Sequence, residues 1–224
     1  MTLATWNLER LKHIKNLPFI IDAIKKVDAD IFVLTEYDER VVLDYPYQIS
    51  TAFIQEEFGV LYQATERRVK LFSSYEIIHE YETFNKHTSL CVELKTPNSN
   101  LIIYATIIGV LGNRHYSFLN DLKLQIEDFR RLGSNKHFCV MGDFNMLFAD
   151  NYYFTKDGRN ILNTAFEELD MYIPTASIKN NIDHIAISKD FTTNAIPNFW
   201  NEDTNHSKLK LSDHMGISVS IKRN

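Results

Sequence analysis

Apolar residues recur along this chain with two spacings, and the change from one spacing to the other marks the predicted elements. Residues 3–8 predict a short strand, and apolar side chains between Leu17 and Ile24 recur at helical spacing. We therefore predict an amphipathic helix over residues 14–27. Residues 31–35 form a continuous apolar run, which is typical of a strand buried on both faces.

The rest of the chain continues this mixture of short strands and amphipathic helices. Apolar residues at helical spacing predict a second helix from Phe118 to Gly133 and a third over residues 161–169. Further strands are predicted at residues 58–62, 69–72, 89–94, 101–106, 138–141, 182–187 and 215–221. The pattern predicts an α/β (α+β) fold in which helices cover sheets. No linker rich in Gly or Pro divides the sequence, so we expect residues 1–224 to form a single domain.

Composition places the chain among ordinary globular proteins. It has 224 residues, of which 45% are hydrophobic and 24% are charged, and its net charge is −5. This charge does not indicate nucleic-acid binding, although a local basic groove can coexist with an acidic total. Cys91 and Cys139 lie in apolar runs and are expected to be buried free thiols. We find no signal-peptide pattern and no membrane-spanning run, so we expect a cytoplasmic monomer with no membrane partner.

Polar side chains stand where four of the predicted strands begin or end. They are Asn7 and Glu9, Glu36, Asp143 and Asn145, and Asp213 and His214. Because function gathers on the loops at a sheet edge, this repetition predicts one polar site there. Carboxylates are the ligands that Mg²⁺ and Mn²⁺ prefer, which makes Glu36, Glu9 and Asp213 candidate metal ligands. Each of these acids alone is equally consistent with a solvated residue at a strand end.

The segment Asp143-Phe144-Asn145 allows two interpretations. If the backbone is extended, Asp143 and Asn145 point the same way and Phe144 enters the core. Asp143 then holds or deprotonates a water molecule, and the Asn145 amide donates to an anionic oxygen. The alternative is an Asx turn, in which both side chains satisfy backbone amides.

Two Asp-His pairs occur in the sequence, and neither can act as a dyad because neighbouring residues on a strand point apart. The useful pairing is across the fold, with Asp183 orienting His214. A carboxylate behind an imidazole fixes its tautomer and raises its basicity. We expect His184 to be structural.

These motifs, taken in order, resemble those of the endonuclease/exonuclease/phosphatase superfamily, which includes pancreatic deoxyribonuclease-like and abasic-site endonuclease-like proteins. The order is Trp-Asn, Thr-Glu, Gly-Asp-Phe-Asn, Ile-Asp-His-Ile and Ser-Asp-His, at residues 6–7, 35–36, 142–145, 182–185 and 212–214. The resemblance implies a four-layer sandwich of two packed mixed β-sheets flanked by helices. It also implies a phosphoesterase that uses Mg²⁺ or Mn²⁺.

The resemblance also implies a role for each site residue. Glu36 is the main metal ligand, with Glu9 and Asp213 near it. Asn7 and Asn145 position metal-bound groups and the scissile phosphate.

The remaining residues act on the water and the phosphate. Asp143 aligns or activates the attacking water. His214, backed by Asp183, contacts the phosphate, and in some mechanisms of the family it is the general base. In-line attack with inversion is expected.

One position departs from the family pattern. Members usually carry a His or Tyr after the middle strand, and Ile107 stands there in this chain. Isoleucine donates neither a proton nor a hydrogen bond, so metal-bound water or a neighbouring group must replace it. Asn113, Arg114 and His115 are the candidates, and Arg114 suits a phosphate as a bidentate donor.

The substrate predicted first is a nucleic acid, with DNA favoured over RNA. The basic run at residues 66–70 offers phosphate contacts, although for each residue an ordinary solvated charge is the favoured interpretation. Tyr152 and Trp200 are candidates for stacking on bases or a sugar, and packing in the core is the other interpretation. The alternatives are a phosphatase or phosphodiesterase for a small phosphorylated metabolite or lipid headgroup, and a non-catalytic binding module that retains the fold.

Overall fold

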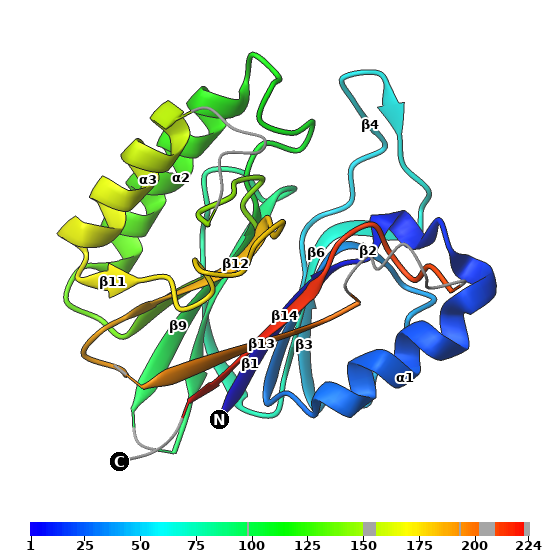
Figure 1. Cartoon of the computed structure of the whole chain (residues 1–224), viewed down its shortest axis with the longest axis horizontal. Helices are drawn as coiled ribbons and strands as arrows, with labels where there is room; N and C mark the ends of the chain where they lie inside the picture. The colour runs from blue at the N-terminus through cyan, green and yellow to red at the C-terminus, as the bar shows by residue number, and fades with distance from the viewer. Residues whose placement is uncertain (98, 150–155, 193, 202–208, 222–224) are drawn as a thin grey trace.

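The computed structural model describes residues 1–97, 99–149, 156–192, 194–201 and 209–221. In these residues two six-stranded sheets pack against each other (Figure 1). Helix α1 (Leu17–Val27) covers the outer face of one sheet, and α2 (Phe118–Gly133) and α3 (Lys156–Glu168) cover the outer face of the other. The four-layer arrangement implied by the sequence motifs is confirmed.

The first sheet has the strand order β13-β14-β1-β2-β6-β3. Its strands β1 and β2 are parallel, and the other neighbouring pairs are antiparallel. The bounds are β1 (Thr2–Asn7), β2 (Ile31–Asp38), β3 (Tyr47–Ser50), β6 (Glu66–Ser73), β13 (Ala195–Trp200) and β14 (Gly216–Ile221).

The second sheet has the order β11-β12-β10-β9-β8-β7, in which only β9 and β10 are parallel. Its bounds are β7 (Glu76–Tyr81), β8 (Ser89–Lys95), β9 (Asn100–Ile107), β10 (Phe138–Asp143), β11 (Met171–Tyr172) and β12 (Asp183–Ser188). Outside the sheets lie the 3-10 helices η1 (Glu9–Leu11) and η2 (Ile14–Asn16) and a hairpin of β4 (Glu56–Glu57) and β5 (Val60–Leu61).

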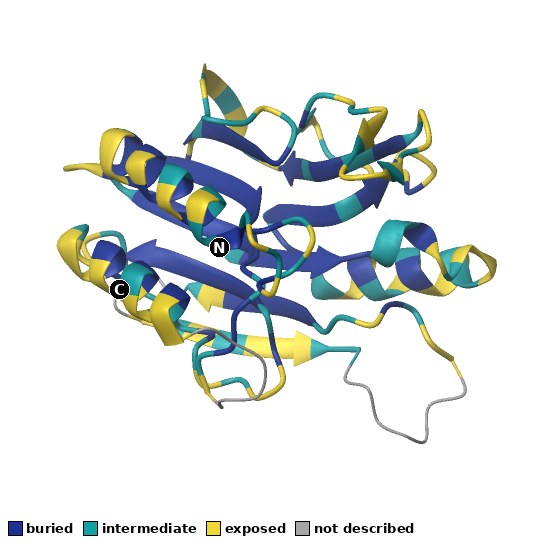
Figure 2. Cartoon of the chain, turned by 90° about the horizontal axis from the view of Figure 1, so that it is seen from above, coloured by how far each residue is buried: buried dark blue, intermediate teal, exposed yellow. Residues whose placement is uncertain are grey.

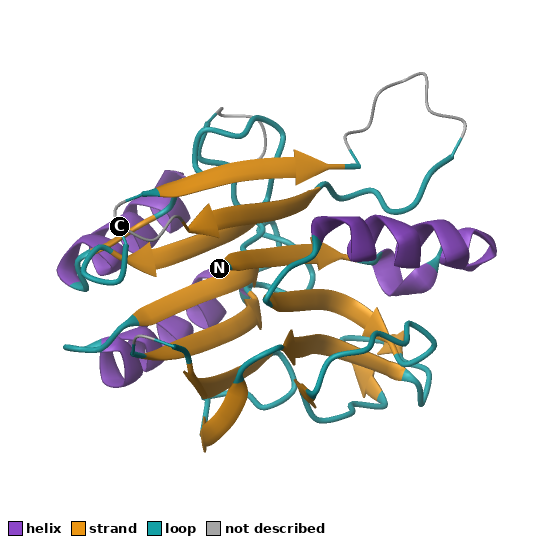
Figure 3. Ribbon diagram, turned by 90° about the horizontal axis from the view of Figure 1, so that it is seen from below, coloured by secondary structure: helices purple, strands orange, loops and turns teal. Residues whose placement is uncertain are grey.

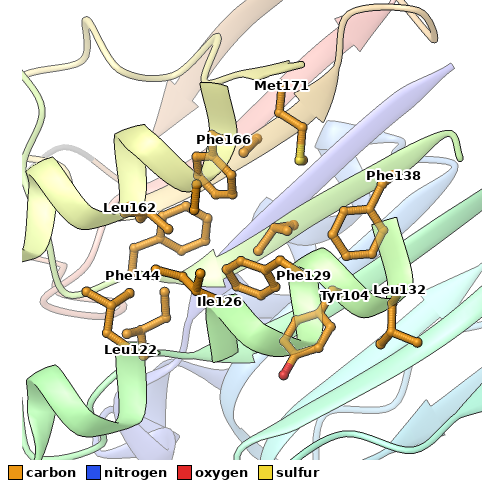
Figure 4. Packing of buried hydrophobic residues seen from close by; sticks show 14 of the residues in the cluster. Tyr104, Leu122, Ile126, Phe129, Leu132, Phe138, Phe144, Leu162, Phe166 and Met171 are labelled. Carbon is orange, nitrogen blue, oxygen red and sulfur yellow. The ribbon is translucent and has the colours of Figure 1, made fainter. Parts of the chain in front are cut away.

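Strict alternation along the central strands builds the layers. In β2, Ile31 and Val33 enter the cluster between the sheets, whereas Phe32 and Leu34 enter the cluster beneath α1. Strand β10 divides in the same way, because Phe138 packs among the aromatic rings beneath α2 and α3 (Figure 4). The strands are therefore buried on both faces, and the helices keep their outer faces in solvent (Figure 2).

The structure corrects several predicted boundaries. The strand predicted at residues 58–62 is wrong in its first half, because Phe58 and Gly59 form the turn of the β4–β5 hairpin with φ of 51° and 78°. The first α-helix begins at Leu17, and residues 14–16 form η2 instead. Strands β3, β7 and β13 were missed because they lie at sheet edges (Figure 3), where half-exposed residues give no clear apolar alternation.

Gly142 is the point at which β10 approaches β9 most closely. A Cβ at this position would lie 2.0 Å from the carbonyl oxygen of Thr106, and the residue has a φ of +139°. We predict that Gly142→Ala lowers the free energy of unfolding by at least about 3 kcal/mol, because backbone must move to admit the methyl group. Gly59→Ala, where no atom lies within 4 Å of the added Cβ, should cost about 1 kcal/mol from its φ alone. Equal losses in urea unfolding would contradict this.

Candidate active site

Two hydrogen bonds between the sheets define the site. Asn7, at the end of β1, donates through Nδ2 to Oδ2 of Asp143 at the end of β10, over 3.1 Å. His214 Nδ1, just before β14, lies 2.6 Å from Oδ2 of Asp183 at the start of β12. Each bond joins the first sheet to the second, so the four side chains meet where the two sheets face each other at one rim.

Local contacts hold His214 in this position. The Ser212 hydroxyl donates to the carbonyl of Asn7 over 2.7 Å and accepts from the His214 amide over 3.1 Å. The indole nitrogen of Trp6 donates to the carbonyl of His214 over 3.0 Å. The motifs at 6–7 and 212–214 are therefore joined by hydrogen bonds that hold His214 in place.

The two aspartates are a buried pair of like charges. Asp143 and Asp183 are partners in the β10–β12 register, and both are almost fully buried. Burial raises the pKa of both carboxyls, and the negative charge of Asp183 raises the pKa of Asp143 further. Oδ1 of Asp183 is buried with no hydrogen-bond partner. This part of the site is therefore short of positive charge and of donors.

His214 supplies part of that charge. Burial acts most strongly on this imidazole and lowers its pKa, but Asp183, Asp143 and Asp213 together outweigh burial and raise the pKa to about 10. In the metal-free protein His214 is therefore an imidazolium at neutral pH, paired with Asp183. Its Nε2 is 3.8 Å from Oδ1 of Asp213.

The turn after β10 follows the second of the two interpretations. The Asn145 amide donates to Oδ1 of Asp143 over 2.8 Å, which is an Asx turn, and Asn145 has a φ of 50°. The extended backbone is therefore wrong, although Phe144 is fully buried as expected. Asn145 Nδ2 donates to the carbonyls of Ile108 and Gly109 over 3.1 and 3.2 Å. In this arrangement the amide donor fixes the turn and does not point a free N–H at a substrate oxygen.

Glu36 lies within β2, which continues to Asp38, and not after the strand as predicted. It has a φ of 46°, an unusual conformation for a glutamate and one that clusters at functional sites. Burial raises the pKa of its carboxyl, against the opposing effects of His214 and a hydrogen bond from Asn7. No side chain in the described parts of the chain forms a salt bridge with it.

The structure places the other two candidate metal ligands differently. Glu9 is paired with Lys12 at 2.6 Å and lies 3.2 Å from the His13 ring, so its carboxylate already has a cationic partner. The Lys12 interaction contributes to a lowered pKa, despite burial acting in the other direction. Asp213 is half-exposed beside His214.

The donor set fits a hard divalent cation, and the residues offer two positions for it. Asp143, Asp183 and His214 each place one ligand atom within 4.8 Å of the others. His214, however, is bonded to Asp183 through Nδ1 and must lose a proton before it can coordinate a metal. Glu36 is partly buried and has no salt bridge among the described residues, which makes its carboxylate the better candidate.

The residues considered for substrate contact lie in different environments. Ile107 is 3% exposed and packs in the cluster between the sheets, so it contributes only a wall. Asn113 is buried and donates to the Asn145 carbonyl over 2.9 Å, which ties its loop to the Asx turn. Arg114 is exposed on the same loop. Tyr152 lies outside the described residues.

Trp200 occupies a packing position. Its ring makes edge contacts with Trp6 and Phe32, at centroid distances of 5.8 and 6.0 Å, in the cluster beneath α1. It does not line the cavity beside Glu36 or the one beside His214. These contacts give it the packing role that was the alternative to stacking on a substrate.

The comparisons with known proteins concern the family and the fold of the chain. The model of the Endonuclease/Exonuclease/phosphatase family matches residues 4–214. The chain belongs to this family. Family membership supports a metal-dependent phosphoesterase. No curated protein matches the chain.

Three solved structures illustrate the similarity of fold. An AP endonuclease from Archaeoglobus fulgidus has a TM-score of 0.71 and 11% identity, with 100% of both chains covered. The endonuclease domain of TRAS1, a telomere-specific non-LTR retrotransposon, has a TM-score of 0.68 and 15% identity over 99% of this chain and 97% of that chain. A mutant beta toxin from Staphylococcus aureus with bound magnesium ions has a TM-score of 0.61 and 14% identity, over 99% of both. None of the helices in the described part of this family member is long and apolar enough to span a bilayer.

His184 ties together the two loops that carry the aspartates. Its Nε2 lies 2.9 Å from the carbonyl of Met146 and 3.0 Å from that of Asn181, and its Nδ1 lies 3.0 Å from the Thr175 hydroxyl. Carbonyls only accept, so Nε2 carries the proton and Nδ1 accepts from the hydroxyl. The ring is fully buried and has the structural role expected of it in this family member.

We predict that His184 makes this protein less stable in acid. Burial lowers its pKa from the ordinary value of 6.5 to about 4, so the unfolded chain takes up a proton before the folded protein does. The stabilisation is complete above pH 6.5 and is lost as the pH falls towards 4, by roughly 3 kcal/mol. Urea unfolding in EDTA at pH 7 and pH 4.5 measures this loss. The less stable His184→Gln variant should lose less stability between the two pH values, and an equal loss would contradict the assignment.

We also predict that Asp183→Asn returns the pKa of His214 towards its usual range. The substitution removes the carboxylate that opposes burial most strongly, so the pKa should fall from about 10 by more than one unit. An NMR titration of the imidazole in EDTA measures it. Asp190→Asn, which changes an exposed carboxylate 3.8 Å from His137, is the matched control and should leave His214 unchanged. A His214 pKa that stays near 10 in Asp183→Asn would show that the pair does not set it.

Proposed function

We propose that this protein is a nuclease that hydrolyses phosphodiester bonds with a divalent cation, Mg²⁺ or Mn²⁺. The observation that carries the proposal is the cross-sheet group of Asn7, Asp143, Asp183 and His214, together with the partly buried Glu36. It combines acidic oxygens for a cation with a cationic donor for a phosphate oxygen. Similarity of fold to two endonucleases supports the choice of nucleic acid.

His214 acts in this proposal as a donor and not as a base. The imidazolium has Nδ1 on Asp183, which leaves Nε2–H to donate to a non-bridging phosphate oxygen. A pKa raised to about 10 favours the protonated ring at neutral pH. The pair therefore stabilises the negative charge that grows on phosphate oxygens in the transition state.

Asp143 is the residue proposed to align and deprotonate the attacking water. Asn7 fixes one of its carboxylate oxygens, and the Asx turn fixes the other. Its raised pKa brings it closer to neutral pH, where a carboxylate is a more effective base. Glu36 is the proposed main ligand of the cation, which would supply Lewis-acid stabilisation of phosphate charge when bound. The half-exposed Asp213 is a proposed second ligand.

We predict metal-dependent cleavage that requires His214. The purified protein is incubated with single- and double-stranded DNA, RNA and bis(p-nitrophenyl) phosphate, in Mg²⁺, Mn²⁺ or EDTA. Cleavage of a nucleic acid should stop in EDTA and fall by roughly 10²–10³-fold in His214→Ala, the scale of removing one donor to a developing oxyanion. His79→Ala, an exposed histidine on β7, is the control and should keep full activity.

The same assay separates the alternatives. Turnover of the aryl ester or of phosphorylated metabolites without cleavage of any nucleic acid would replace the nuclease with a small-ester phosphodiesterase or phosphatase. Cleavage that survives in His214→Ala would remove the proposed role of the imidazolium. Calorimetry that detects no binding of Mg²⁺ or Mn²⁺ would favour a binding module that retains the fold.

A further inference from the structure

A second binding position lies next to Glu36. A cavity of about 150 Å³ opens there, and Glu36, Ile107, Arg10, Arg68 and Tyr62 are among the residues that line it. The cavity beside His214 has a different lining, which includes Asp183 and Asp213. Three arginines and no lysine line the cavity beside Glu36. Arg67 pairs with Glu39 at 2.9 Å, whereas Arg10 and Arg68 have buried nitrogens with no hydrogen-bond partner.

Arg68 is a buried cation with donors left over. The residue is only 4% exposed. Its Nη2 contacts the Tyr62 hydroxyl at 3.0 Å and the Glu57 carboxylate at 2.6 Å. Its Nε and Nη1 are buried and have no hydrogen-bond partner. Unsatisfied donors on a buried charged group are costly, so an acceptor is expected to complete them.

Arg10 lines the same cavity with a second guanidinium group. Its Nη2 donates to the Leu61 carbonyl and to the Glu66 carboxylate, each over 2.7 Å, and its Nε is buried without a partner. The guanidinium carbons of Arg10 and Arg68 lie 4.6 and 4.9 Å from the centre of the Tyr62 ring. Both guanidinium groups therefore contact Tyr62, and an anion bound near them would offset the repulsion between their like charges.

The carboxylates near Arg10 and Arg68 leave the unpartnered nitrogens of these arginines without an acceptor. Glu66 is engaged by Arg10 and by the Gln63 amide. Glu57 reaches only Nη2 of Arg68 among the described contacts of that arginine. Glu36 is the proposed cation ligand, and a bound divalent cation would cancel its charge. An additional anion close to the cation site is therefore electrostatically compatible with the cavity.

Aromatic rings from the β4–β5 hairpin and from the segment before α2 lie near one another. Phe58, at the tip of the β4–β5 hairpin, is half-exposed although its φ of 51° is unfavourable for a bulky residue. Its ring lies 5.0 Å from that of His115, which lies 4.3 Å from that of Tyr116. Tyr116 is 83% exposed. The hairpin and the segment before α2 both rise above the sheets (Figure 1). Val60 of the hairpin and Val110 and Leu111 of that segment line the cavity.

We propose that Arg10 and Arg68 form a subsite for the phosphate that neighbours the scissile one in a single-stranded nucleic acid, whose bases stack on Phe58 and Tyr116. The proposal rests on the proposed nuclease function. Guanidinium groups with free N–H donors match phosphate oxygens, and exposed aromatic rings accept unpaired bases of any sequence. A small phosphate ester has no second phosphate and no second base for this face.

The test compares a substrate that reaches the subsite with one that does not. Binding of a fluorescein-labelled thymidine hexanucleotide is measured by anisotropy in EDTA, and kcat/KM is measured in Mn²⁺ for the hexanucleotide and for bis(p-nitrophenyl) phosphate. Arg10→Gln and Arg68→Lys should each weaken hexanucleotide binding and lower its kcat/KM by about tenfold. The aryl diester, which carries one phosphate, should lose less than about threefold. Thermal melting establishes that each variant is folded, and the partly exposed Arg10 provides the test if Arg68→Lys does not fold.

Arg130→Gln is the matched control, because this exposed arginine pairs with Glu168 on the helical layer of the other sheet. Equal losses on both substrates would overturn the subsite in favour of a structural role, and so would an unchanged affinity for the hexanucleotide or a wild-type protein that does not bind it. A wild-type protein that binds the hexanucleotide but hydrolyses no ester would overturn the nuclease function alone. The anisotropy of the variants would then still decide the subsite.

Discussion

The contact between the two sheets at one rim is the constraint on which the site depends. Asn7 and His214 come from the first sheet or its approach, and Asp143 and Asp183 come from the second. The hydrogen bonds Asn7–Asp143 and Asp183–His214 exist only while the sheets hold their relative position. Removal of one partner from such a buried charged pair leaves the other uncompensated, which is costly. Packing between the sheets and the chemistry at their rim are therefore coupled.

The apolar cluster between the sheets supplies the energy that holds this position. Its members alternate with residues that face the outer helices, so each central strand is buried on both sides. The rim is where this alternation stops and polar side chains take over. Glu36 shows the transition most clearly, since it interrupts the regular conformation of β2 with a positive φ. A carboxylate in that position without a salt bridge implies an external positive charge.

The sequence predicts the layers and the main groups of the site well, because both are encoded locally. Strand alternation is visible in a few residues, and the motif order places Asp143, Asp183 and His214 at strand ends. Conformations that depend on distant partners are predicted less well. Asn145 adopts an Asx turn and donates to the carbonyls of Ile108 and Gly109, contacts that no local pattern reveals.

Burial of charged and aromatic side chains is the other property that the sequence leaves open. Arg68 belongs to a basic run that is equally typical of a solvated strand, yet the hairpin with Glu57 and the ring of Tyr62 enclose it. Glu9 stands in a motif but pairs with Lys12 one helical turn later. Trp200 ends an edge strand and nevertheless packs on Trp6. Each outcome depends on segments that meet only in the folded chain.

The most direct test of this account is the position of the cation. Crystals soaked in Mn²⁺ and measured for anomalous scattering would locate it without reference to any substrate. The account predicts a peak about 2.1 Å from the Glu36 carboxylate, with the Asp183–His214 hydrogen bond intact. A peak held instead by Asp143 and Asp183, with His214 displaced from Asp183, would contradict both the ligand assignment and the role of the imidazolium.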